Sequence, residues 1–254
     1  MISWRLGSAF ASLAIVVLAL IAASVHFAFS YIQARMLELG DLQTESQRVA
    51  LGGARQVHAE LLMGVGDLTL TGRATELMEA EFLYYTPPLH SVMTYTVAEE
   101  VGTLRIIYAS PDAVPNFEQE PKFQSKSFVR LSNAVPVSLT VGLAVNEGHL
   151  RLAGLNLSEL NIGLAMGDVE IDLRDDWQHS FAVDIGGGFG ETVVWLPADT
   201  GVRVQLEDSG EKVSLRGLKP SGDFYVNDAF GKTPVTLDVS VGGEPGQIRL
   251  EVAR

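Results

Sequence analysis

The sequence contains no cysteine. This absence excludes disulfide bonds, Cys-ligated zinc, iron–sulfur clusters and thiol catalysis. It does not identify a compartment, because a chain of 254 residues can bury a core large enough to fold without disulfides. The sequence also has no run of lysine or arginine, and its formal net charge is −13. A chain this acidic repels phosphate backbones, so we expect no nucleic-acid partner.

Charged residues are missing between Arg5 and Arg35. Within this interval, residues 9–29 are long enough to cross a bilayer as a helix, which requires about 20 apolar residues. We therefore predict an uncleaved membrane anchor. The alternative is a signal peptide, for which residues 22–24 and 28–30 are only loose matches to a small-residue cleavage site.

Basic residues near the predicted anchor do not decide its orientation. Arg5 precedes it, whereas Arg35, Arg48 and Arg55 follow it among acidic residues. Because so short an N-terminal tail is easily left in the cytoplasm, we expect a single-pass protein of the cell membrane whose remaining domain is extracytoplasmic.

Helical periodicity is missing from about Val57 onward. Short runs that alternate apolar and polar residues occur instead, separated by Gly, Pro, Asn and Asp, which is typical of an all-β chain. Residues 74–82 can be read as a helical turn or as a strand. We predict an all-β fold of stacked strands, solenoid-like or a sandwich, behind one N-terminal transmembrane helix.

The chain is divided by its composition into an anchor, a juxtamembrane helical stalk with a loose apolar stripe, a first β unit, a Pro-rich loop and a second β-repeat unit. These segments are residues 1–30, 31–54, 55–109, 110–127 and 128–254. The stalk could instead be a helix that pairs with a partner.

A phrase of one glycine followed by an alternating strand recurs along the chain, first in MGVGDLTLTG at residues 63–72. Its copies begin at Gly66, Gly102, Gly148, Gly167 and Gly246, with a degraded copy at Gly190. In each full copy the second and fourth residues after glycine are aliphatic, and a period of two sends both to one face of a strand. These aliphatics are Leu68, Leu70, Leu104, Ile106, Leu150, Leu152, Val169, Ile171, Ile248 and Leu250. We expect the glycine to provide the bend into each strand. The polar positions vary, which indicates a scaffold repeat and not a catalytic motif.

The segment LLMGVGDLTLTGRATELMEAEFLY (residues 61–84) resembles the opening of the toast-rack N-terminal domain, in which a Gly-x-Gly-x-Leu-x-Leu phrase precedes an Ala-x-x-Leu segment. Residues 173–206 and 224–252 are similar to later parts of such proteins and to the C-terminal domains of LiaF-type cell-wall stress regulators. The resemblance implies a stack of strands on a bacterial membrane-anchored protein and provides no catalytic residues. The single predicted span departs from the multi-helix membrane domain of the regulators, which argues against direct kinase inhibition.

Residues that could carry chemistry each have a simpler interpretation. GGGFG at residues 186–190 lacks the Lys-Ser/Thr of a phosphate-binding loop, which favours a turn. Asp175, Asp176 and His179 could ligate a cation or form an acidic turn around Trp177. The sequence therefore predicts no enzyme, no cofactor, and no catalytic, cofactor-binding or metal site.

Aromatic and charged residues could still form binding surfaces. One candidate is a carbohydrate-contacting patch, and the alternative is that the same aromatic rings fill the end of the core. These rings are Phe82, Tyr84, Tyr85 and Tyr95. If the repeat strands are neighbours, a second candidate is a ladder of cross-strand charge pairs on an exposed face. Its members are Arg105, Arg151, Arg249 and Glu170.

These observations favour a non-enzymatic, membrane-anchored β-repeat protein of the bacterial cell envelope, an interaction or sensing module linked to envelope stress. One alternative is a structural or adhesin-like surface protein that self-assembles through strand edges. Another is a carbohydrate-active enzyme on a β-solenoid, which lacks a convergent carboxylate cluster in the sequence. The expected partners are the membrane, through residues 9–29, and either an envelope protein or a second copy.

Overall fold

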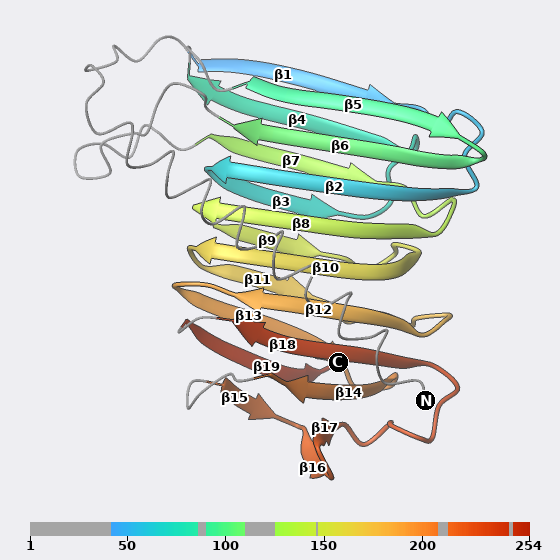
Figure 1. Ribbon diagram of the computed structural model, residues 1–254, viewed down its shortest axis with the longest axis vertical. Helices are drawn as coiled ribbons and strands as arrows, with labels where there is room; N and C mark the ends of the chain where they lie inside the picture. Colours follow the sequence, from blue (N-terminus) through green and yellow to red (C-terminus); the bar gives the residue numbers. More distant parts are fainter. Residues whose placement is uncertain (1–41, 86–89, 110–124, 146, 208–212, 244–245) are drawn as a thin grey trace, which may run out of the picture.

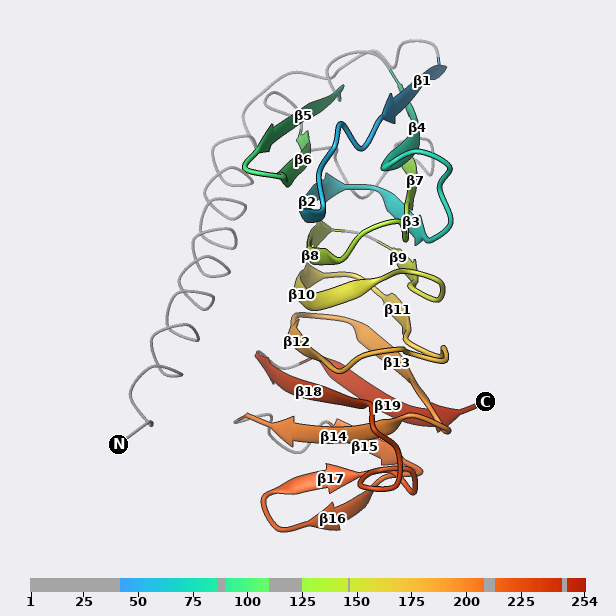
Figure 2. The same cartoon turned by 90° about the vertical axis from the view of Figure 1, so that its right-hand side faces the viewer.

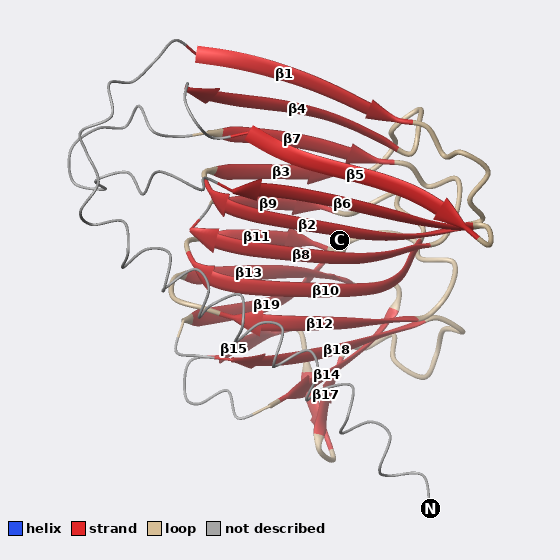
Figure 3. Ribbon diagram, turned by 45° about the horizontal axis from the view of Figure 1, so that its top comes forward, coloured by secondary structure: helices blue, strands red, loops and turns tan. Residues whose placement is uncertain are grey.

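The computed structural model describes residues 42–254 except 86–89, 110–124, 146, 208–212 and 244–245. These residues form 19 strands and no helix, in two sheets that pack face to face as a tall stack (Figures 1 and 3). The predicted all-β stack is confirmed. The predicted anchor lies outside the described residues, and within them no helix is long and apolar enough to cross a membrane.

Sheet A, as we call the first sheet, has nine strands. In spatial order they are β1 (Leu42–Val49), β4 (Met78–Tyr85), β7 (Lys126–Leu131), β3 (Asp67–Thr71), β9 (Gly148–Arg151), β11 (Val169–Asp172), β13 (Glu191–Pro197), β19 (Gln247–Ala253) and β15 (Val213–Arg216). From β7 to β15 all neighbours are parallel, whereas β1 and β4 are antiparallel additions at one end.

Sheet B has ten strands. In spatial order they are β16 (Lys219–Ser221), β17 (Phe224–Val226), β14 (Gly201–Leu206), β18 (Thr236–Gly243), β12 (Phe181–Gly187), β10 (Leu157–Met166), β8 (Val137–Val145), β2 (Gln56–Val65), β6 (Val101–Ala109) and β5 (His90–Ala98). Its central strands are parallel, and antiparallel strands lie at both ends.

The repeating unit, or rung, is one strand of sheet B followed by the next strand of sheet A. The rungs are β6–β7, β2–β3, β8–β9, β10–β11, β12–β13, β18–β19 and β14–β15, in spatial order (Figure 2). Because side chains alternate across each strand, every second residue enters the space between the sheets. All ten aliphatics that the repeat predicts to point inward are less than 9% exposed. They belong to one continuous core of buried residues.

The last rung in the sequence, β18–β19, does not lie at the end of the stack. β19 pairs with both β13 and β15, and β18 pairs with both β12 and β14. The β18–β19 rung is thus inserted between two rungs that precede it in the sequence. Strands on the two sides of the predicted Pro-rich loop also share sheets, since β2 pairs with β8 and β3 pairs with β7 and β9.

Turn glycines are required where stacked backbones approach closely. Gly66, Gly167 and Gly190 have φ of 114°, 122° and 128°, a region that favours glycine. A Cβ at Gly190 would clash with the carbonyl oxygen of Gly167 in the next rung. The predicted role of glycine is therefore confirmed at these turns.

That role is wrong for the glycines at 102 and 148. Gly148 is the first residue of β9 and lies opposite Leu68, whereas the repeat predicts it opposite Gly66; a Cβ there would come within 2.9 Å of Leu143 Cδ1. Gly102 lies inside β6, where the hydroxyl of Tyr95 occupies the space that a Cβ would take. Both positions require glycine because a neighbouring side chain occupies the space where a Cβ would lie.

The helical stalk predicted over residues 31–54 is wrong from Leu42 onward. Residues Leu42–Val49 form β1, which pairs with β4 along its whole length and places Arg48 opposite Glu79. Pairing with an existing sheet outweighs the helix propensity of this charged segment. Residues 31–41 lie outside the described part of the chain. The strand reading of residues 74–82 is correct from Met78 onward.

Candidate interaction surface

Side chains of the acidic turn after β11 make hydrogen bonds to backbone groups. Asp175 accepts the N–H of Gly154 at 2.5 Å, and His179 Nε2 lies 2.7 Å from the carbonyl oxygen of Leu157. Trp177 is buried and donates its indole N–H to Leu173 at 2.8 Å. The described residues contain no group of three His, Asp or Glu side chains that could hold a metal ion. This segment is a corner of the fold.

The GGGFG phrase covers the last two residues of β12 and the turn that joins β12 to β13. A Cβ at Gly188 would clash with the carbonyl oxygens of Leu164 and Ala165, so the chain packs directly on the neighbouring rung. The N–H of Phe189 donates to the carbonyl of Ala165 at 2.9 Å, and the carbonyl of Gly190 accepts from Gln247 at 2.9 Å. These backbone groups are used within the stack, which agrees with the turn interpretation.

The four aromatic residues considered as a carbohydrate patch do not gather on one surface. Phe82 is fully buried. Tyr84, from sheet A, donates its hydroxyl to Glu45 at 3.4 Å, and Tyr95, from sheet B, donates to the carbonyl of Leu51 at 2.7 Å. Burial raises the pKa of both tyrosines. Tyr85 lies in β4, and its side chain is outside the described part. Three of the rings thus close the end of the core, as the alternative expectation stated.

The predicted charge pairs form, but between different residues. Arg105 lies on sheet B, where it pairs with Glu60 at 2.6 Å. On sheet A, Arg249 pairs with Glu191 at 3.3 Å. The two-residue offset at β9 places Arg151 opposite Asp172 instead of Glu170. The expected row of Arg151, Glu170 and Arg249 therefore does not exist.

A longer ladder runs across the outer face of sheet A, which we call the ladder face. From β1 to β15, successive strands contribute Arg48, Glu79, Arg130, Thr71, Arg151, Asp172, Trp195, Glu251 and Arg216. Opposite charges alternate along much of this row. Because neighbouring strands lie about 4.8 Å apart, these charges are close enough to pair across the strands. Arg130 contacts Glu79, and Arg216 lies 3.4 Å from Glu251.

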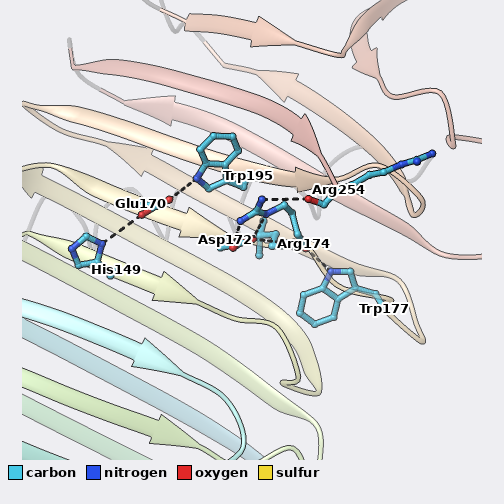
Figure 4. A network of polar contacts seen from close by, with 8 residues as sticks. His149, Glu170, Asp172, Arg174, Trp177, Trp195 and Arg254 are labelled. Carbon is cyan, nitrogen blue, oxygen red and sulfur yellow. Dashed lines mark hydrogen bonds and ion pairs between the residues drawn. The ribbon is translucent and has the colours of Figure 1, made fainter.

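Toward the β15 end of the ladder face, Trp195 on β13 anchors a polar network (Figure 4). Its indole N–H donates to Glu170 at 2.7 Å, and Glu170 also lies 3.6 Å from Nδ1 of His149. The guanidinium of Arg174 lies 5.2 Å from the centroid of the Trp195 ring, within the range of a cation–π contact. Arg174 also donates to both oxygens of Asp172, at 2.9 and 2.7 Å.

This network fixes side chains that would otherwise be mobile. Burial raises the pKa of Asp172, but the hydrogen bonds and charge of Arg174 outweigh it and hold that pKa below its ordinary value. Asp172 therefore stays ionised and keeps Arg174 in place over Trp195. A rigid polar surface of this kind loses little side-chain entropy on binding. The repeat pattern does not single out Trp195, although a large aromatic residue at an outward strand position is a usable signal.

Comparison with known proteins identifies a family and solved structures of similar fold. The family model described as the N-terminal domain of toast_rack (DUF2154) matches residues 38–195, more than half of the chain. No curated protein sequence matches. Among solved structures, a putative cell adhesion protein from Clostridium sporogenes ATCC 15579 is 25% identical, with 84% of this chain and 100% of that chain covered and a TM-score of 0.76.

A second solved structure, a putative adhesin from Bacteroides fragilis NCTC 9343, is 12% identical over 84% of this chain and 97% of that chain. Its TM-score of 0.31 is too low to support any inference.

Proposed function

Because the chain belongs to the toast-rack N-terminal domain family, we propose that it is a non-enzymatic interaction module of the bacterial cell envelope. In this proposal residues 9–29 anchor it in the membrane, its β stack lies on the extracytoplasmic side, and the bound partner links it to envelope stress. The likeness to a protein named for cell adhesion favours a binding role over a catalytic one.

The ladder face is the observation that carries this proposal. It combines alternating charges, a partly exposed tryptophan and side chains already held by one another. Tryptophan and arginine are enriched where proteins bind proteins, and prearranged side chains lower the entropy cost of association. The polar groups face outward on separate strands and converge on no single point, unlike an active site.

Photo-crosslinking in the native membrane tests this function. A crosslinking amino acid is placed on the ladder face at Thr69 or Val193, and on the outer face of sheet B at Ala182 or Ser240 as a control. We expect one protein to be captured from the ladder face and not from sheet B. If neither face captures a protein, with or without a wall-active antibiotic, the proposed function is wrong.

Self-assembly is a second candidate because the two ends of the stack differ. At one end the edge strands β1 and β5 are 8 and 9 residues long, and within the described residues each has a single neighbour. At the other end β15 and β16 have 4 and 3 residues, and β16 contains a proline. Long edges can pair with a further strand. Sedimentation of the full chain in mild detergent tests this, and a monomer at all concentrations would exclude it.

A further inference from the structure

Two large hydrophobic side chains are exposed at the tight turns from sheet B to sheet A. Met166, at the end of β10, is 53% exposed, and Phe189, just after β12, is 57% exposed. The N–H of Gly167 donates to the carbonyl of Phe189 at 2.8 Å, and Met166 and Phe189 form a parallel bridge. Because this backbone is fixed, the two side chains form a defined surface and not a loose loop. We call it the turn ridge; its turns lie at the left of Figure 1.

The same register position is apolar in two further rungs. Val65 is opposite Val145, and Val145 is opposite Met166. An apolar residue thus occupies the same register position at the turn in four successive rungs. Turn geometry does not demand this, since turns favour Gly, Asn, Asp and Ser. Exposed apolar side chains that lie together, as those of Met166 and Phe189 do, commonly mark a binding site.

A row of carboxylates follows the turn ridge on the sheet A side of the same turns. Its members are Asp67, Glu147, Asp168 and Glu191, one at each of four successive turns. Lys126 lies 3.9 Å from Asp67, and Arg249 lies 3.3 Å from Glu191, so cations neutralise both ends of the row. Within the described part of the chain, neither Glu147 nor Asp168 has an ion-pair partner. Two negative charges in the middle of the row remain uncompensated beside the exposed apolar side chains.

We propose that the turn ridge binds a basic amphipathic helix of a partner polypeptide. Apolar residues of that helix cover Met166 and Phe189, and its Lys or Arg residues meet Glu147 and Asp168. The spacing is compatible: adjacent rungs lie about 4.8 Å apart, and residues three or four apart on a helix have Cβ atoms about 5–6 Å apart. The inference rests on the proposed function, because it names the kind of partner that the interaction module takes.

Charge distinguishes this partner from the two other ligands that could cover an apolar ridge. A second copy of this chain brings a net charge of −13 and the same carboxylate row, so the two ridges repel. An anionic lipid surface is repelled by Glu147 and Asp168 for the same reason. A cationic apolar segment gains from both parts of the surface, and its affinity should fall as salt screens the charges.

Binding of a designed peptide to the full chain tests the proposal. The protein is placed in nanodiscs of zwitterionic lipid, with empty nanodiscs as the blank. The probe is a fluorescent leucine–lysine peptide of about 18 residues, or five helical turns, with one apolar face. A scrambled peptide of equal composition is the reference. We expect the amphipathic peptide to bind at least about tenfold more tightly than the scrambled one, since a few anchor contacts dominate such affinities.

Matched variants locate the binding. Phe189→Ser should weaken binding about tenfold, whereas Phe128→Ser, at an exposed phenylalanine of the ladder face, should change it less than about twofold. Glu147→Gln with Asp168→Asn should also weaken it about tenfold, and the asparagine oxygen still accepts the N–H of Glu191. Asp199→Asn with Asp223→Asn removes the same charge elsewhere and should have little effect.

The proposal is overturned if the peptide does not bind, or if ridge and control variants bind it equally. These outcomes leave the proposed function open to its own test, because crosslinking through the ladder face does not depend on the peptide. If crosslinkers on the ladder face capture a partner and those at positions 166 and 189 never do, the proposed function stands and the turn ridge is not the contact.

Discussion

The side-chain oxygen of Asn227 accepts the backbone N–H of Val202 at 2.9 Å. It also accepts the N–H of Phe230 at 3.0 Å, while the amide nitrogen donates to the carbonyls of Pro197 and Thr200 at 3.0 and 2.7 Å. Asn227 is 3% exposed. One side chain therefore joins the end of β13, the start of β14 and the turn after β17.

Replacing Asn227 with alanine should lower the free energy of unfolding by about 2–4 kcal/mol, because three buried backbone groups, of Val202, Pro197 and Thr200, lose this partner. Asn227→Asp should also be destabilising, since a carboxylate cannot donate to two carbonyl oxygens. Urea denaturation of the detergent-solubilised chain measures both. The exposed Asn133→Ala variant is the control and should stay within about 0.5 kcal/mol of the parent. Equal midpoints for Asn227→Ala and Asn133→Ala would contradict this account.

Alanine at Gly190 should destabilise the stack by about 2 kcal/mol or more, because its φ of 128° is strained for an L-residue and its Cβ would meet the carbonyl of Gly167. Gly186, four residues earlier, is the matched control. A Cβ there has only the carbonyl of Ile162 nearby, at 3.6 Å. Gly186→Ala should change stability by less than about 1 kcal/mol, in the stabilising direction. Thermal melts compare the two, and similar losses would refute the close-approach argument.

The stability contributed by Glu79 should disappear in acid. Hydrogen bonds from the side chain and backbone of Thr75, together with the charge of Arg130 and Arg48, outweigh burial and lower the pKa of Glu79. A carboxyl group with a lowered folded pKa contributes stability above its unfolded pKa and loses it as the pH falls through the folded value. Glu79→Gln should therefore be less stable than the parent at pH 7. The two denaturation midpoints should converge below the ordinary pKa of 4.5. A constant difference at all pH values would speak against it.

The contribution of Asp184 to stability should depend on pH in the opposite direction. Burial raises its pKa, and the charges of Glu159 and Glu207 raise it further. When the folded pKa lies above the unfolded value, stability falls as the pH rises through that interval. Asp184→Asn should thus be more stable than the parent at pH 7 and equal to it below the ordinary pKa of 3.8. Denaturation at both pH values tests this, and a destabilised variant at pH 7 would show that the carboxylate has a favourable role.

Strand alternation could be predicted from the sequence because it is a local property. The inward positions of the repeat follow from a period of two, and they are buried whichever strands are neighbours. Register could not be predicted in the same way. Gly148 looks like a turn glycine in the sequence, but Leu143 and Val169 fill the space beside it inside the stack. Because of that offset, Arg151 lies opposite Asp172 and not Glu170, so the predicted row of charges does not form.

Contacts between distant segments explain the other differences. Residues Leu42–Val49 have a helix-compatible composition and become a strand only because β4 presents a free edge. The sequence indicates a polar turn at Asp175 and His179, but their backbone partners are about 20 residues earlier, Gly154 in the turn after β9 and Leu157 at the start of β10. Phe189 and Met166 read as ordinary turn and strand residues, and only the register places them side by side on the surface.

The inserted position of the β18–β19 rung makes synthesis order matter. A ribosome delivers β14 and β15 before the strands that join them to β12 and β13. Until residue 253 has been made, the strands that flank the missing β18–β19 rung have unpaired edges: β12 and β13 on one side, β14 and β15 on the other. Such edges can pair with strands of other chains. Correct folding of this protein therefore requires these unpaired edges to be shielded, or the last rung to pair with them before a neighbouring chain does.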